Sequence, residues 1–75
     1  MKEKVRSILQ EILPDVDFDA ETALFDDGII ESFDVIQIMS ELMDSFSIDL
    51  NAEDIEPENL NSLDAIVALV ESRLP

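Results

Sequence analysis

The stretch LFDDGIIESFDVIQIM, residues 24–39, sets the fold of the chain. Apolar residues follow one another at helical steps through its second half and beyond: Val35, Ile38, Met39, Leu42 and Phe46. This spacing predicts an amphipathic helix over about 32–46. The first half holds Gly28, the only glycine of the protein, so we expect a backbone turn there that a side chain would disfavour.

Two further helices are expected on either side of this stretch. Helical spacing of apolar residues predicts one helix over about 2–13, which Pro14 ends, and another over about 62–73, capped by Asn61 or Ser62. The connection 14–31 is long for a helix bundle, so apolar side chains should hold it between the helices: Phe18, Leu24, Phe25, Ile29 and Ile30.

The second connection, 47–59, has room for one short helical turn around 52–55, before Pro57. No segment alternates apolar and polar residues as a half-buried strand does. The predicted fold is therefore all-α, a small bundle of three main helices plus one short helix in the second connection.

Composition bounds what the protein can do. The chain has 75 residues, enough for a single domain spanning 1–75, and it carries 19 acidic residues against 4 basic ones, a formal charge of −15. Binding to nucleic acid is not expected, because phosphate recognition needs Lys and Arg. The absence of Cys and His removes zinc sites, thiol catalysis and the usual general base. With no apolar run long enough to enter a membrane, we expect a cytoplasmic monomer.

The charge is unevenly distributed along the chain. No basic residue occurs between Arg6 and Arg73, and 18 acidic residues lie in that interval. The acidity has two interpretations: it provides solubility, or it steers the protein to basic surfaces of partner proteins.

An Asp-rich run offers one candidate site. Asp15, Asp17 and Asp19 alternate as oxygen ligands do in a calcium-binding loop. The fit is poor, because Ala20 stands where such a loop has glycine and Asp26 stands where it has a bidentate Glu. A calcium-responsive protein is kept as a lesser alternative.

Ser32 is the second candidate. A Ser that opens a helix is ordinarily an N-cap. Here the preceding Gly-Ile-Ile turn should bring Ser32 to the surface, Glu31 and Asp34 flank it with negative charge, and the bulky Phe33 follows. No His or nearby Lys is available to take its proton, so the chain is not expected to be an enzyme. If this hydroxyl reacts, another enzyme must use it.

The run from Leu24 to Asp34 resembles the acyl carrier protein family, which includes D-alanyl and aminoacyl carriers. In that family a short signature ends in Asp-Ser-Leu or Asp-Ser-Phe, and the chain has Glu31-Ser32-Phe33 at this place. The resemblance extends over almost the whole chain, from the first helix through SIDLNAEDI to LNSLDAIVAL. The Ser-Phe pair is closer to the D-alanyl type than to fatty-acid carriers.

The resemblance implies a phosphoprotein in which Ser32 accepts 4'-phosphopantetheine from coenzyme A, and the arm thiol carries cargo as a thioester. It implies three partners: a phosphopantetheinyl transferase, an acyl- or aminoacyl-activating ligase and a downstream acyl-transfer enzyme. It also implies a set of partner-recognition residues around the second helix and the short connector helix: Glu31, Phe33, Asp34, Ile36, Gln37, Met43 and Ile55. For Met43 and Ile55, ordinary core packing is an equal alternative. An unmodified acidic adaptor of the same fold remains the main functional alternative.

Overall fold

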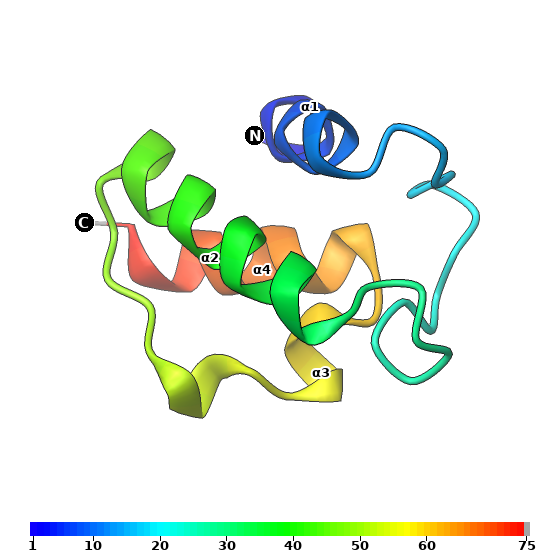
Figure 1. The fold of residues 1–75 in the computed structure, drawn as a ribbon. Helices are drawn as coiled ribbons and strands as arrows, with labels where there is room; N and C mark the ends of the chain where they lie inside the picture. Colours follow the sequence, from blue (N-terminus) through cyan, green and yellow to red (C-terminus); the bar gives the residue numbers. More distant parts are fainter. Residues whose placement is uncertain (75) are drawn as a thin grey trace.

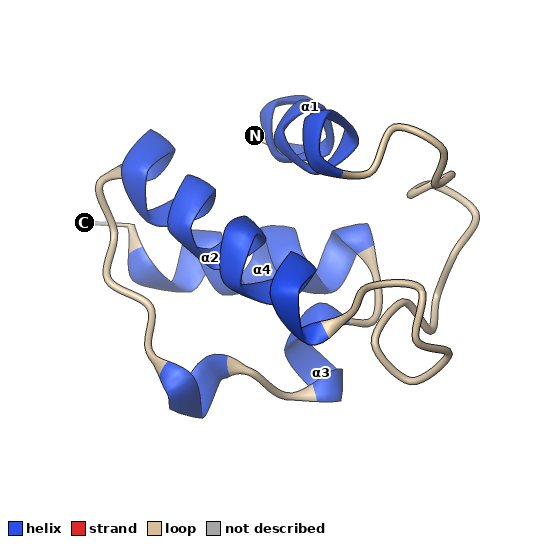
Figure 2. Ribbon diagram, viewed as in Figure 1, coloured by secondary structure: helices blue, strands red, loops and turns tan. Residues whose placement is uncertain are grey.

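The protein is described here from a computed structural model, which covers residues 1–74. Those residues form helices joined by loops, in the order α1 (Lys2–Ile12), α2 (Ser32–Phe46), the 3-10 turn η1 (Ala52–Asp54), α3 (Pro57–Leu60) and α4 (Leu63–Arg73). No strand occurs within them (Figure 2). The all-α prediction is confirmed, and the three main helices lie where the apolar spacing placed them.

The helices enclose one apolar core. Helix α1 contacts both α2 and α4, and α3 packs against α4 (Figure 1). Every helix and both connections contribute buried apolar side chains: Val5, Leu9, Phe18, Leu24, Ile30, Val35, Ile38, Met39, Leu42, Ile48, Leu50, Leu60, Leu63, Ile66, Leu69 and Val70. Burial of this set is the main source of stability, since each fully buried aliphatic side chain contributes about 1.5–3 kcal/mol.

The long connection between α1 and α2 is held by apolar contacts, as predicted. Phe18, Leu24 and Ile30 are buried in the core, and Phe25 and Ile29 pack against its edge. Gly28 has φ of +70°, the left-handed region that side chains rarely adopt. The predicted glycine turn is therefore confirmed.

The second connection contains one more helix than predicted. The expected short turn is present as η1, but Pro57 does not end the helical structure of this segment. It opens α3 at the first helical position, where its missing N–H costs nothing and its fixed φ suits a helix. Ser62 then caps α4 by accepting a hydrogen bond from the Ala65 N–H at 3.0 Å. A rule that treats proline only as a stop signal misses α3.

Candidate functional site

Ser32 lies at the surface, at the point where the long first connection becomes α2. It is the first residue with helical geometry, and Glu31 before it is extended, with φ of −98° and ψ of 172°. Its side chain is exposed. The alternative that Ser32 is the N-cap is wrong, because Glu31 holds that position. The Ser32 hydroxyl is consequently not committed to capping the helix.

The first turn of α2 is fixed by Asp34, whose side chain reaches back to the residue before the helix. The Asp34 carboxylate accepts a hydrogen bond from the backbone N–H of Glu31 at 3.0 Å. This is the reciprocal half of a capping box, in which the third helical residue reaches back to the N-cap. The bond sets the angle at which the loop enters the helix, and therefore the positions of the two residues in between, Ser32 and Phe33.

The loop before α2 is held by hydrogen bonds to Asn61, a residue distant from it in the sequence. The side-chain oxygen of Asn61 accepts hydrogen bonds from the N–H groups of Phe25 and Asp26 at 3.1 and 3.0 Å. Its amide nitrogen donates to the Asp26 carboxylate at 3.0 Å, and its backbone carbonyl accepts from the Leu24 N–H at 2.9 Å. Asn61 was predicted only as a possible helix cap, and no sequence pattern links it to residues 24–26.

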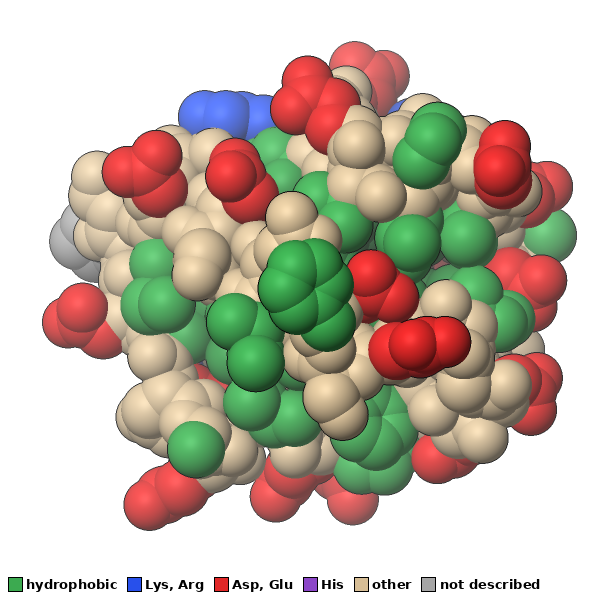
Figure 3. Space-filling view, viewed as in Figure 1, with side chains coloured by type: hydrophobic (Ala, Val, Ile, Leu, Met, Phe, Trp, Pro, Cys, Tyr) green, Lys and Arg blue, Asp and Glu red, His purple; other side chains and the backbone are tan. Residues whose placement is uncertain are grey.

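Large apolar side chains are exposed around Ser32. Phe33 is 70% exposed, Ile36 is 60% exposed and Ile55 is 37% exposed. Figure 3 shows hydrophobic side chains gathered on the face of the molecule that carries α2, with carboxylates around them. Exposed apolar residues of this size that gather at one place are typical of an interaction surface.

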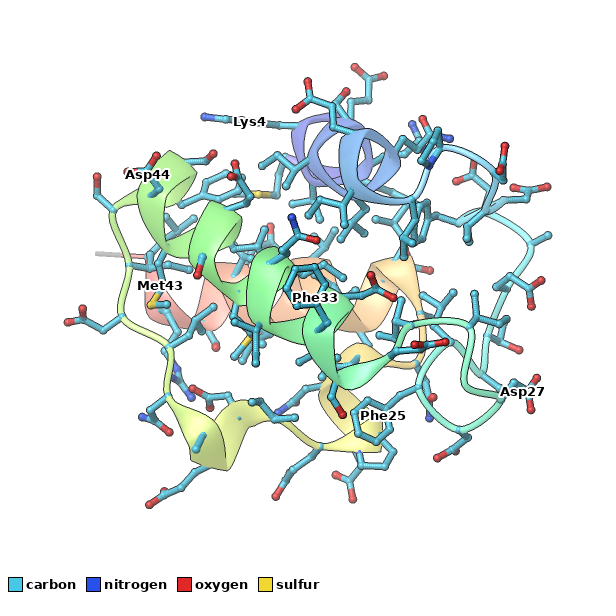
Figure 4. All side chains as sticks on the ribbon, in the orientation of Figure 1. Lys4, Phe25, Asp27, Phe33, Met43 and Asp44 are labelled. Carbon is cyan, nitrogen blue, oxygen red and sulfur yellow. The ribbon has the colours of Figure 1, made fainter. Side chains whose placement is uncertain are left out.

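A groove opens beside Ser32. Its volume is about 180 Å³, and it is lined by Phe25, Ser32, Val35, Ile36 and Ile55. Figure 4 shows Phe25 below the first turn of α2 and Phe33 on the outward side of that helix. The structure thus brings Ser32, Ile36 and Ile55 together, although Ile55 directly follows η1 instead of lying within it.

A second groove continues along the same side of α2. Its volume is about 220 Å³, and Ile36 and Ile55 line it as well as the first. The other lining residues come from α2 and from the connector: Met39, Ser40, Met43, Leu50, Asn51 and Ala52. Met43 is partly buried against the core, as the core-packing alternative expects, and it also lines this groove.

Four of the predicted recognition residues line neither groove. Glu31 and Gln37 are exposed, and Asp34 is partly buried. Together with Phe33 they lie on the first two turns of α2 or directly before them. The predicted set therefore divides into groove-lining residues and residues on the helix surface around Ser32.

The connector that forms the far wall of the grooves is held by an ion pair. Asp54, only 5% exposed, accepts two hydrogen bonds from the Arg73 guanidinium, one of them at 2.9 Å. The same carboxylate accepts the Asn51 N–H at 3.0 Å. The hydrogen bonds that Arg73 donates are the largest cause of the lowered pKa of Asp54, and the Asn51 N–H adds to it. Donating to the Asp54 carboxylate in turn raises the pKa of Arg73. No sequence pattern predicts this pairing, apart from the isolation of Arg73 among acidic residues.

The candidate calcium ligands do not come together within the described residues. The Asp19 carboxylate pairs with Arg6 at 2.9 Å, and the Asp17 carboxylate accepts the Asp19 N–H at 3.1 Å. Within residues 1–74, no three acidic side chains are arranged to hold a metal ion. The Asp-rich run is therefore a turn fixed by its own hydrogen bonds and by α1.

Comparison with known proteins gives the same assignment as the sequence resemblance. The family model described as "Phosphopantetheine attachment site" matches residues 3–70. The chain belongs to the acyl carrier protein family. Members of this family are not catalysts: they are substrates of other enzymes and work with transferases and ligases.

Two curated proteins that resemble the chain are both D-alanyl carrier proteins. The D-alanyl carrier proteins of Lactococcus lactis subsp. cremoris strains MG1363 and SK11 are each 31% identical to this carrier, over 97% of its length and 95% of theirs. No solved structure matches the chain significantly. None of the helices described in residues 1–74 has the length and apolar character needed to cross a bilayer.

Proposed function

We propose that Ser32 carries the 4'-phosphopantetheine arm of this carrier. The observation that carries the proposal is the place of its hydroxyl, exposed at the first position of α2 and at the mouth of an apolar groove. Ser32 also occupies the position of the Ser in the family signature. The Ser32 oxygen would attack the phosphorus of coenzyme A that bears the pantetheine. As the new P–O bond forms, the pyrophosphate P–O bond of coenzyme A would break, and adenosine 3',5'-bisphosphate would leave.

The remaining requirements of this step must come from the transferase. The protein has no His, so the base that takes the Ser32 proton lies on the partner. The attached phosphodiester would sit at the N-terminus of a 15-residue helix, whose unpaired N–H groups and dipole favour negative charge. The residues present therefore fit the group, and the group supplies the only thiol, because the chain has no Cys.

We propose a short aminoacyl cargo, D-alanyl being the first candidate, held as a thioester on that thiol. The D-alanyl carriers among the relatives support this choice. The open character of both grooves supports it too, since they lie at the surface beside α2, outside the packed core. A D-alanine-activating ligase, ATP and D-alanine should produce a mass gain on the holo protein that neutral hydroxylamine removes.

Partner enzymes would bind the surface around Ser32. We define this docking face by seven exposed, partly buried or groove-lining residues around Ser32: Glu31, Phe33, Asp34, Ile36, Gln37, Met43 and Ile55. An apolar centre with carboxylates around it complements an enzyme surface that has an apolar patch within Lys and Arg residues. The chain would act as one cytoplasmic, monomeric carrier domain serving the transferase, the ligase and an acyl-transfer enzyme in turn.

Intact mass spectrometry tests the attachment. The protein is incubated with coenzyme A, magnesium and a permissive phosphopantetheinyl transferase, next to Ser32→Ala and the control Ser40→Ala. We expect one phosphopantetheinyl group on the wild type and on Ser40→Ala, and none on Ser32→Ala. No gain on any folded sample, even after Glu31→Asp, would instead support an unmodified acidic adaptor.

A further inference from the structure

Asn61 holds three successive residues of the loop before α2, although it lies in the turn between α3 and α4. Its side-chain oxygen accepts the N–H groups of Phe25 and Asp26, its amide nitrogen donates to the Asp26 carboxylate, and its carbonyl accepts the Leu24 N–H. Figure 1 shows this turn beside the loop that enters α2. We call these four hydrogen bonds the Asn61 clasp. We propose that the clasp makes Asn61 a positioning residue for arm attachment, a role that rests on the modification proposed at Ser32.

Hydrogen bonds continue from the clasp to the start of α2. Each backbone N–H from residue 24 to residue 31 has an acceptor. The first three acceptors are atoms of Asn61, the next four are carbonyls of the loop itself, and the last is a carboxylate in the first turn of α2. In particular, the Leu24 carbonyl accepts the N–H groups of Ile29 and Ile30, at 3.0 and 3.1 Å. Leu24 therefore joins the clasp to the residues that lead directly into the helix.

The clasp also fixes a side chain beside the reacting hydroxyl. Phe25, whose N–H is held by Asn61, lines the same groove as Ser32. The backbone that leads into α2 therefore determines where the Ser32 oxygen stands. Transfer of the arm is sensitive to that place, because reacting atoms must come within about 3–3.5 Å in the right orientation. Without the clasp, unpaired N–H groups would let the loop take other conformations, in which Ser32 is misplaced.

The side-chain part of the clasp needs an acceptor for two N–H groups and a donor for a carboxylate. One Asn side chain supplies both. Asn61 and Asp26 can exchange these roles in the double variant Asn61→Asp/Asp26→Asn. The carboxylate at position 61 then accepts the two N–H groups, and the amide at position 26 donates to it. This exchange variant rebuilds the clasp with reversed polarity and keeps the formal charge of −15.

Amide hydrogen exchange of the unmodified protein tests whether the clasp acts beyond the residues that it touches. We expect Asn61→Ala to accelerate exchange at Ile29 and Ile30 as well as at residues 24–26, because Leu24 joins the two sets. The exchange variant should restore protection at all of them. Faster exchange confined to residues 24–26 would show that the clasp does not control the approach to Ser32, and would overturn the inference.

Steady-state kinetics of arm transfer by a phosphopantetheinyl transferase test the role itself, at a temperature where every variant is fully folded. A loop that is misplaced for part of the time lowers the competent fraction of the carrier. Asn61→Ala should therefore raise the apparent KM for the carrier about 3–10-fold and leave kcat within about twofold of the wild type. The exchange variant should recover the wild-type KM. Asp26→Asn alone is the control for the lost charge, because it leaves an acceptor for the Asn61 amide.

The kinetic outcomes separate this role from a structural one and from the attachment itself. A lower melting temperature of Asn61→Ala with an unchanged KM would make Asn61 only structural and overturn the inference. The same conclusion follows if KM stays raised in an exchange variant whose amide protection is restored. A wild type that gains no phosphopantetheinyl group would overturn the attachment at Ser32, and this role with it.

Discussion

Asp54 and Arg73 form a two-pronged ion pair that fastens the connector between α2 and α3 to the last turn of α4. Asp54 is buried, and the Arg73 side chain is about a third exposed. Arg73 also reaches the carbonyl of Asp49, at 3.4 Å. The isolated basic residue near the end of the sequence is thus what holds the far wall of the grooves beside Ser32.

Asp54→Asn should destabilise the fold more than a comparable change at the surface. The variant removes the charge of the buried carboxylate, so the ion pair is lost and the Arg73 guanidinium keeps only neutral acceptors at this place. The control is Asp64→Asn, which removes the Lys2–Asp64 pair, where the Asp64 side chain is 81% exposed. Urea titrations should show a clearly lower free energy of unfolding for Asp54→Asn and little change for Asp64→Asn. Equal effects would mean that the connector is not held by this pair.

The same pair predicts a pH dependence. The pKa of Asp54 is lowered in the folded protein, chiefly by the Arg73 hydrogen bonds. Its contribution to stability is therefore complete above about pH 4, the ordinary range of Asp, and is lost as the pH falls through the lower folded value. The stability difference between wild type and Asp54→Asn should be constant from pH 5 to 7 and shrink below about pH 4. A difference that is unchanged at pH 3 would contradict the assigned direction.

Asn61→Ala should loosen the loop before α2. Two backbone N–H groups lose their acceptor and Asp26 loses a donor, so the free energy of unfolding should fall by about 1–3 kcal/mol. The control is Gln10→Ala, a substitution at an exposed position of α1, which should change the free energy of unfolding by no more than about 0.5 kcal/mol. Hydrogen exchange should locate the effect, with faster exchange at Phe25 and Asp26. If hydrogen exchange at these two amides is unchanged, the hydrogen bonds to Asn61 are not needed to hold this loop.

Glu31→Asp should stabilise the start of α2. Asp is a preferred N-cap and Glu is not, so the shorter side chain should add about 0.5–1 kcal/mol. Thermal unfolding measures this gain, and Glu31→Gln, which keeps the length and removes the charge, serves as the control. No stabilisation by Asp would indicate that the Asp34 carboxylate already fixes this turn by itself.

Salt should stabilise the protein without regard to the identity of the divalent ion. A formal charge of −15 makes the folded state repel itself, and added salt screens that repulsion. Calcium and magnesium at the same millimolar concentration should raise the melting temperature equally. A large excess for calcium at micromolar concentration would restore the Asp15–Asp19 calcium hypothesis.

The fold was predictable because apolar spacing determines which helical faces are buried, and the positions of α1, α2 and α4 follow from it. The predicted site residues around Ile36 and Ile55 followed from family resemblance, since nothing in the spacing of a sequence joins residue 55 to residue 32. The Asn61 clasp and the Asp54–Arg73 pair were not predicted. Both link distant positions through single polar contacts, which leave no periodic pattern.

The role of Ser32 in stability also needed the structure. As an N-cap it would have contributed about 1 kcal/mol, but Glu31 occupies that position. Ser32→Ala should therefore leave the melting temperature nearly unchanged, which makes it a clean test of function. A large loss of stability in this variant would mean that the hydroxyl has a structural role.

Tandem mass spectrometry of the wild-type protein, after treatment with coenzyme A and a phosphopantetheinyl transferase, identifies the residue that carries the arm. We predict one phosphopantetheinyl group, located by fragmentation on the peptide that contains Ser32, and an equally folded Ser32→Ala variant that gains none. The group on another serine, or equal modification of Ser32→Ala, would contradict the assignment of Ser32 as the attachment residue.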